Sequence, residues 1–429
     1  MADIVMLELL PRTWFLFLFP LFLFLFLLFV HYYWFIVNEK TGKRQHHLLP
    51  SPPSPPALPI IGHLHLVGSL PHVSLRALAA RHGRDGLLLL RLGTVRTLIV
   101  SSPRAAEAVL RTHDHVFASR PRSMVPDIIL YGSSEVAFAP YGEHWRQAKK
   151  LLTNHVLSVK MVQSLRSVIM EEVSMVMSKI NEATTVGGVM DMSELLKSFT
   201  YILLSVQMEY GLTKEDMKAL LTDVFFGSTE TSSNTLEFTL AELVRSPCLI
   251  GKLQDEVRSI VPRGQEVVSE ADINKMTYLR AVIKESLRLH PVAPLLVPHL
   301  AMIEGNIDGY MVPAETHVLI NVWAIGRDSS YWEEVEEFIP ERFLDEGSAA
   351  GVNFKGNDFQ FLPFGAGRKM CPGINLGITT VELMLANLMY HFDWELPLGV
   401  ERKDINMTEL FGLTMRRKEK LLLVPKSHM

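Results

Sequence analysis

A glycine-rich loop around one cysteine, near the C-terminus, constrains the fold of this chain more than any other segment. Residues 361–373 read FLPFGAGRKMCPG, and a long apolar stretch follows. Glycines let a backbone approach a flat partner closely. Phe364 can pack over the face of such a partner, and Arg368 can pair with a carboxylate on its edge. The fold therefore has to deliver Cys371 to a shaped, sheltered site.

The loop is typical of a thiolate that binds haem iron, where the sulfur pushes electron density towards oxygen. The alternative is a buried cysteine in a turn before a helix, the usual role of a lone cysteine beside glycine. Phe364, Arg368, Cys371 and Gly373 are in register here, which favours the iron ligand. The second cysteine, Cys248, lacks such neighbours, and we expect an inert thiol.

Composition excludes several classes of protein. The 429 residues permit one large domain or several average ones. The 42 basic and 46 acidic side chains give no broad attraction for nucleic acid. Two cysteines, one of them assigned to iron, leave no pair for a disulfide, which suits the reducing side of a membrane. A small-molecule enzyme fits this balance.

The N-terminus predicts a transmembrane helix. Residues 14–37 contain no Asp, Glu, Lys or Arg, and as a helix they would measure roughly 36 Å, enough to cross a hydrocarbon core of about 30 Å. Lys40, Lys43 and Arg44 follow the span and place its C-terminal side in the cytoplasm. A cleaved signal peptide would have a shorter apolar core. A buried core helix is the remaining alternative.

A proline-rich stretch, residues 52–59, follows and favours a stiff, extended spacer. Recognition by an SH3-type domain is an alternative, although an apolar segment follows directly. We divide the chain into a membrane anchor (1–37), a basic and proline-rich hinge (38–62) and a main domain (63–429).

Within the main domain the patterns predict mostly helices, so the fold class is mainly α with a small β part. Hairpins are expected at 87–101, around Gly93, and near 306–310, where Asp-Gly is a turn signal. Helices are expected at 214–245, 252–261 and 273–289.

Two helical segments carry polar groups with a chemical interpretation. Glu285 and Arg288 lie three residues apart and can form an ion pair, which alone is most often a solvated surface pair. Residues 227–232 (GSTETS) interrupt a long helix with small and hydroxyl side chains. Glu230 and Thr231 could relay protons there. The alternative is hydroxyls that bond back to helix carbonyls.

These segments, with the anchor and hinge, resemble plant microsomal cytochrome P450 enzymes over nearly the whole chain. Residues 137–147 and 325–328 look like the grass branch that contains indole-derivative hydroxylases. The resemblance implies a cytochrome P450-like fold with an N-terminal transmembrane helix. It also implies haem b with Cys371 as the metal ligand. The family usually has Gly where this chain has Ser228, and Arg where it has Lys149.

The resemblance also implies roles for other residues. Glu285, Arg288 and Arg342 would form a buried structural lock beneath the haem loop, and Glu230 and Thr231 would deliver protons. The remaining implied cofactor contacts are Trp145, Lys149, His299, Phe364, Arg368 and Gly373. Taken alone, His299 is more often an ordinary loop histidine. The implied walls of the substrate pocket are Leu295, Val297, Phe411 and Leu413.

The implied activity is a monooxygenase that inserts one atom of O2 into a small apolar specialised metabolite. Electrons would come from NADPH through NADPH-cytochrome P450 reductase. The implied location is the endoplasmic reticulum membrane, with a single pass through its lipid and the catalytic domain on the cytoplasmic side. No nucleic acid partner is expected.

One departure from the family concerns length. Only 85 positions separate Trp145 from Glu230, where the family has further helices, so this chain is short by on the order of 80 to 90 residues. The join is expected near 197–202, and the missing part would roof the substrate pocket. A catalytically impaired or silent truncated haem protein is therefore the alternative hypothesis.

Overall fold

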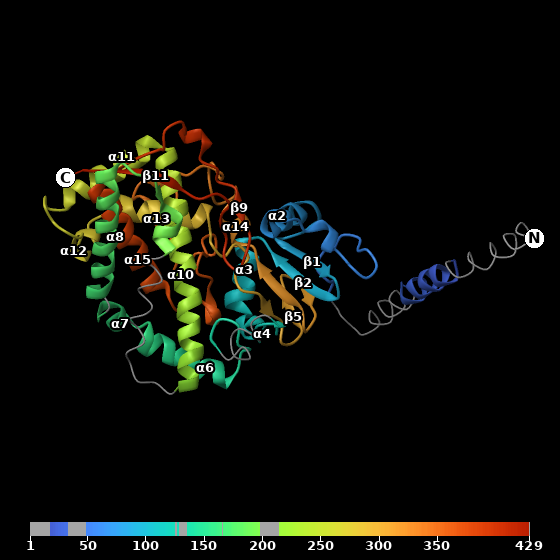
Figure 1. The fold of residues 1–429 in the computed structure, drawn as a ribbon. Coiled ribbons are helices and arrows are strands. Elements are labelled where there is room, and N and C mark those ends of the chain that lie inside the picture. Colours follow the sequence, from blue (N-terminus) through green and yellow to red (C-terminus); the bar gives the residue numbers. More distant parts are fainter. Residues whose placement is uncertain are drawn as a thin grey trace, which may run out of the picture.

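The computed structural model describes residues 18–32, 49–124, 127, 135–164, 166–197 and 214–428. Most long helices gather in one half of the molecule, and a four-stranded sheet with α2 forms the other (Figure 1). The longer helices are α2 (Pro71–His82), α6 (Glu143–Leu151), α7 (Val159–Ser164), α8 (Arg166–Val186), α10 (Lys214–Arg245), α11 (Pro247–Ile260), α13 (Thr277–Leu289) and α15 (Ile374–His391). The short helical segments are η1 (Leu64–Leu66), α3 (Pro103–Glu107), η2 (Ala108–Thr112), α4 (Asp114–Phe117), η3 (Leu152–Val156), α12 (Glu270–Ile273), α14 (Val322–Ile325), η5 (Pro340–Phe343), η6 (Gly367–Lys369) and η7 (Arg402–Asp404).

The strands are β1 (Leu87–Leu92), β2 (Val95–Val100), β3 (Met190–Asp191), β4 (His299–Leu300), β5 (Gly305–Ile307), β6 (Tyr310–Val312), β7 (His317–Ile320), β8 (Phe392–Glu395), β9 (Glu409–Leu410), β10 (Arg416–Arg417) and β11 (Leu422–Ser427). The main sheet has the order β1-β2-β7-β4, with β2 and β7 parallel. The mainly α fold with a small β part is thus confirmed.

Both hairpins form where the sequence predicts them. β1 and β2 pair from Leu87↔Val100 to Leu92↔Val95, and Gly93 at the turn has a φ of +64°. β5 and β6 meet at Asp308-Gly309, whose φ values of +49° and +85° fit a turn with two left-handed residues. Such turns match the right-handed twist of the flanking strands, so the Asp-Gly pair sets the register.

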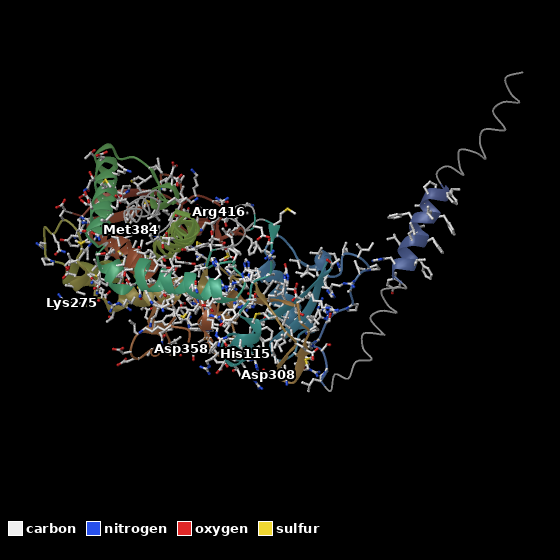
Figure 2. The ribbon with its side chains drawn as sticks, turned by 90° about the horizontal axis from the view of Figure 1, so that it is seen from below. His115, Lys275, Asp308, Asp358, Met384 and Arg416 are labelled. Carbon is white, nitrogen blue, oxygen red and sulfur yellow. The ribbon has the colours of Figure 1, made fainter. Side chains whose placement is uncertain are left out.

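The core of the helical half forms where α10, α13 and α15 pack together, with α8 against α15. Every residue from Ser232 to Val244 on α10 is buried, as are most of the residues of α13 and α15. Met384 of α15 lies inside this core, whereas the labelled Lys275 lies at its rim (Figure 2). The C-terminal half of α10 is therefore fixed by packing.

Helix boundaries follow the prolines. α10 ends at Arg245 because the residue before Pro247 is pushed out of the helical region. α11 starts at Pro247, five residues before the predicted start, because proline is favoured in the first turn of a helix. The helix predicted at 273–289 was wrong in its start: α12 ends at Ile273, and α13 begins at Thr277.

The predicted anchor and hinge are described only in part. Residues 18–32 are helical and 14–17 and 33–37 lie outside the described residues. Among the described residues, none of the helices is long and apolar enough to cross a membrane. The described end of the hinge is bound to the globular part, because the Leu89 and Met311 amides donate to the Pro53 and Pro50 carbonyls. This end of the stretch therefore packs on the main domain.

A buried carboxylate joins α13 to the segment around η5. Arg288 donates to both Glu285 oxygens at 2.8 Å, and Arg342 donates to Oε1 at 3.1 Å. The amide of Ile339 donates to the same oxygen at 2.8 Å. All three side chains of this lock are at most 4% exposed. The sequence thus predicted a contact between Glu285 and Arg342, which lie 57 positions apart.

The lock supports the cysteine loop through aromatic packing. Phe343 follows Arg342 in η5, and its ring lies 5.4 Å from that of Phe361, the first residue of the loop. Trp332 packs against both rings, and the Arg288 guanidinium lies 5.4 Å from the Trp332 ring. The charged cluster and the loop therefore share one packed wall.

We predict that Glu285→Gln lowers the free energy of unfolding by about 3–5 kcal/mol, because two buried guanidiniums lose their carboxylate. Urea unfolding monitored by circular dichroism measures this change. The matched control is Glu182→Gln on α8, an exposed position where we expect a change within about 0.5 kcal/mol. Equal effects at the two positions would contradict a stabilising lock.

A second buried polar chain joins α2, β9, α13 and α10. His72 Nε2 lies 2.8 Å from Glu409 Oε2, and His290 Nε2 lies 2.8 Å from Glu242 Oε1. His290 Nδ1 is 3.9 Å from Glu409 Oε1. Burial raises the pKa of Glu409, but the contacts with His290 and His72 outweigh it and bring the pKa to about 2. The C-terminal hairpin is thus held by an ionised carboxylate.

We predict that Glu409 contributes on the order of 3 kcal/mol to stability at neutral pH, because its pKa falls from 4.5 to about 2 on folding. A group with a lowered folded pKa stabilises fully above its unfolded pKa and loses that effect as pH falls towards 2. As pH falls from 5.5 to 3, the free energy of unfolding of Glu409→Gln should therefore decrease less than that of the unaltered chain. Parallel stability curves in thermal unfolding would refute this role.

Candidate functional site

An apolar cavity lies where α6, α10, the turn after α13 and the cysteine loop meet. Its empty volume is about 1360 Å³, counting the part that opens to solvent. Most of the residues that line it are apolar. The cavity therefore suits a largely apolar ligand.

The cysteine loop forms one wall. Gly365 and Gly367 have φ values of +68° and +67°, which favour glycine, and the Cys371 amide donates to the Phe364 carbonyl at 3.0 Å. This bond closes the loop and turns the Cys371 sulfur towards the cavity, where Phe364 and Gly373 also line the wall. The loop thus presents one sulfur beside an aromatic ring.

The environment of Cys371 acts on its thiol in two directions. Burial raises its pKa, while a hydrogen bond from the Gly373 backbone and the charge of Lys149 lower it. The side chain borders the cavity. Burial is the largest of these effects, so the net shift of the pKa is upward.

Part of the cavity lining is basic. Arg120, Lys149, Lys369 and His299 all line the cavity. Arg120 is 5% exposed and donates to the carbonyls of residues 137, 297 and 298, and among the described residues no carboxylate pairs with it. Burial lowers the pKa of Arg120 to about 9, so it stays charged at pH 7. A buried charge without a counter-ion favours an anionic ligand.

The Lys149 ammonium is already bonded to the protein and is not free to bind an anionic ligand. Its ammonium donates to the carbonyls of Arg368 and Met370, the latter at 3.2 Å, and lies 5.2 Å from the Trp145 ring. Burial lowers its pKa, and Cys371 raises it. Lys149 therefore fastens α6 to the loop and also supplies charge near the sulfur.

Trp145 and His299 line the cavity, and one ring nitrogen of each is hydrogen-bonded to a backbone carbonyl. The Trp145 indole N–H donates to the Val136 carbonyl at 2.9 Å. His299 Nδ1 is 2.8 Å from the Phe117 carbonyl, and burial with nearby Arg120 lowers its pKa well below the usual value. The neutral ring donates through Nδ1 and leaves Nε2 as an acceptor. A carboxylate nearby would favour the protonated ring.

Arg368 differs from its predicted role. It pairs with Asp114 at 3.3 Å and does not line the cavity, whereas its neighbour Lys369 does. Successive residues of the tight turn η6 point in different directions. Lys369 lines the cavity in place of Arg368, and its ammonium donates to the Ala139 carbonyl at 2.8 Å.

On α10 the structure separates the two predicted proton carriers. Thr231 lines the cavity, and its hydroxyl donates to the Gly227 carbonyl at 2.5 Å. Ser228 bonds back to Val224 in the same way, at 2.6 Å. Glu230 is exposed, lies outside the cavity lining, and accepts a hydrogen bond from Thr414 at 2.8 Å. The hydroxyls of Ser228 and Thr231 thus bond back to helix carbonyls, as the alternative interpretation expects.

Only Val297 of the four predicted substrate walls lines the cavity. Leu295 packs into a separate core with Leu75 and Leu88, and the exposed Phe411 and Leu413 lie outside the lining. The physical reason is a left-handed residue: Leu296 has a φ of +51°, so the chain turns there and Leu296 replaces Leu295 at the cavity.

Sequence reasoning missed two residues of the lining. Arg120 precedes Pro121 at the end of an apolar segment, and an arginine in such a place signals a buried charge. Lys369 was hidden by its neighbour Arg368. Both residues could have been found only by asking which cations the cavity would bury.

The residues fit haem b. The thiol at one wall supplies an iron ligand, the apolar lining accepts a macrocycle, and Arg120 lacks the anion that a propionate provides. The sequence profile of the family described as cytochrome P450 matches residues 52–209 and 201–424. The chain belongs to the cytochrome P450 family. It is a cytochrome P450 monooxygenase, and its cofactor is haem b.

Two maize proteins are similar to most of the chain. Indole-2-monooxygenase of Zea mays is 46% identical, over 89% of this chain and 88% of the relative. Indolin-2-one monooxygenase of Zea mays is 44% identical, over 90% of each chain. A solved structure described as zebra fish cytochrome P450 with abiraterone has a TM-score of 0.73 and 22% identity, and the match covers 84% of this chain and 100% of that one. That likeness shows the fold.

The comparison with indole-2-monooxygenase also bears on chain length. The alignment runs over 474 residues but uses 89% of these 429, so about 90 aligned positions of the relative have no counterpart here. The two stretches matched by the family profile meet at 201–209. The expected join at 197–202 lies mostly outside the described residues.

We predict that Gly367→Ala destabilises the cysteine loop and lowers haem content, because a Cβ there would lie 2.0 Å from the Leu110 carbonyl oxygen. The control is Gly187→Ala, whose φ of +66° matches the +67° of Gly367 but whose Cβ would meet no atom within 4 Å. Both variants lose about 1 kcal/mol to left-handed strain. In urea unfolding, only Gly367→Ala should lose more free energy of unfolding than this strain accounts for. Equal losses in the two variants would refute the contact with Leu110.

Proposed function

We propose that this chain inserts one oxygen atom from O2 into a small apolar specialised metabolite, with electrons delivered from NADPH by a cytochrome P450 reductase. The observation that carries the proposal is the Cys371 sulfur, which faces an apolar cavity beside the small-residue patch of α10. Cysteine-ligated haem supplies the activation of oxygen there. The substrate class follows from the apolar lining and from the names of the maize relatives, which identify indole and indolin-2-one.

The cofactor would be held by residues of three segments. Cys371 would ligate iron, with Phe364 and Gly373 packing beside it. Arg120 and Lys369 would pair with the propionates, and the pull of Arg120 is strong because its side chain is buried. Lys149 would favour the thiolate, since its charge lowers the pKa of the Cys371 thiol.

Lys149, Trp145 and His299 would support that placement. Lys149 fixes the loop through two carbonyls, and Trp145 packs against both Lys149 and Lys369. The neutral His299 ring presents Nε2 as an acceptor, so it would donate to the anionic edge only in its protonated form. These contacts orient the cofactor more than they bind it.

Proton delivery would use Glu230 and Thr231. Glu230 is exposed, so it can exchange protons with water, and Thr231 is its neighbour on the cavity side of α10. Thr231 would have to release its bond to the Gly227 carbonyl before it donates into the cavity. This requirement makes the hydroxyl available only when the helix yields locally.

The location we propose is the endoplasmic reticulum membrane. A single pass through residues 14–37 would hold the catalytic domain on the cytoplasmic side, where the reductase and NADPH are available. The charge order around that segment supports the orientation.

A second candidate is a truncated haem protein without turnover. It is favoured by the missing segment, because the described cavity lining contains no residue between Leu157 and Val224. Water that reaches the cavity through this side would weaken its electrostatic interactions and divert the reaction.

We predict that the chain gives a reduced carbon-monoxide difference spectrum with the Soret band of a thiolate-ligated haem, and that Cys371→Ser abolishes it. Cys248→Ser, at an exposed cysteine outside the cavity, should leave the band unchanged. A folded chain that takes up no haem would rule out the proposal. A normal band without product from NADPH, reductase and indole would favour the second candidate.

A further inference from the structure

The C-terminal hairpin reaches the proton-carrying patch of α10 through one hydroxyl. Thr414 lies in the turn between β9 and β10, and Arg416, labelled in Figure 2, belongs to the strand that follows. The Thr414 hydroxyl donates to Glu230 Oε2 at 2.8 Å. It accepts from Asn234 Nδ2 at 3.2 Å. One side chain thus bridges two residues of α10.

Asn234 makes this bridge rigid. It lies four residues after Glu230, so both side chains project from one face of α10. Asn234 is 2% exposed, and its Nδ2 also donates to the Met415 carbonyl at 3.2 Å. The Met415 amide in turn donates to the Val292 carbonyl at 2.8 Å, and Val292 lines the cavity. The position of Thr414 is therefore fixed from both sides.

The bridge restricts the Glu230 side chain, which lies outside the cavity lining while its neighbour Thr231 lies within it. A glutamate on an exposed helix face has several rotamers of similar energy, and fixing one costs side-chain entropy. A hydrogen bond to the carboxylate offsets that cost and holds one rotamer. Without Thr414 the carboxylate would sample several rotamers.

We propose that Thr414 is a positioning residue that holds the Glu230 carboxylate in one rotamer for proton delivery. This inference rests on the function proposed above. Glu230 takes a proton from bulk water and passes it towards the cavity, and Thr414 neither gains nor loses a proton overall. The apolar turn of Phe411 and Leu413 precedes Thr414, so the hairpin that carries the turn also sets the carboxylate.

A double-variant cycle tests the contact in the haem-loaded chain without turnover. Thr414→Val and Glu230→Ala should each lower Tm, and the double variant should lose less than the sum of the two single losses. Thr408→Val provides the control, because Thr408 bonds to Asn406 and its effect should add to that of Glu230→Ala. Strict additivity for Thr414 would overturn the proposal.

Turnover separates positioning from folding. With NADPH, reductase and indole, Thr414→Val should lower product formed per NADPH several-fold and leave KM within twofold, and Thr414→Ser should restore the ratio. An unchanged ratio in Thr414→Val, with Glu230→Gln impaired, would overturn the role of Thr414 alone. An unimpaired Glu230→Gln would overturn the role of Glu230 as well. The Tm cycle decides the contact even where indole is not oxidised.

Discussion

The buried carboxylate of Glu285 is the interaction on which the rest of this structure depends. Two guanidiniums and one amide converge on it, and each guanidinium also binds carbonyls of the segment between α14 and η5. Charged groups without water impose strict geometry, since each unsatisfied partner costs several kcal/mol. The aromatic wall of Trp332, Phe343 and Phe361 transmits that geometry to the cysteine loop.

The cavity combines this fixed sulfur with a wall of positive charge. Arg120 is buried and donates through Nε and Nη1 to carbonyl oxygens, and among the described residues no carboxylate balances its charge. Lys149 and Lys369 lie near the same indole ring and add to the field. Such a wall selects an anionic ligand by charge and leaves its orientation to the hydrogen bonds.

Sequence reasoning was strongest where one residue type has no substitute. Glycines at positive φ, a cysteine in register with Phe364, and the spacing of Glu285 and Arg288 are all readable without coordinates. It failed where the chain turns within one residue. Lys369 and Leu296 line the cavity, whereas their neighbours Arg368 and Leu295 do not. The direction of each side chain depends on local dihedral angles, which residue types do not specify. Arg120 was missed because its meaning comes from burial.

The unbalanced charge of Arg120 has a further consequence for the life of the chain. A protein that buries a cation without a counter-ion gains stability when a matching anion binds, and the gain follows mass action. Folding and cofactor binding are then linked equilibria. We expect the haem-loaded chain to unfold at a higher temperature than the haem-free chain.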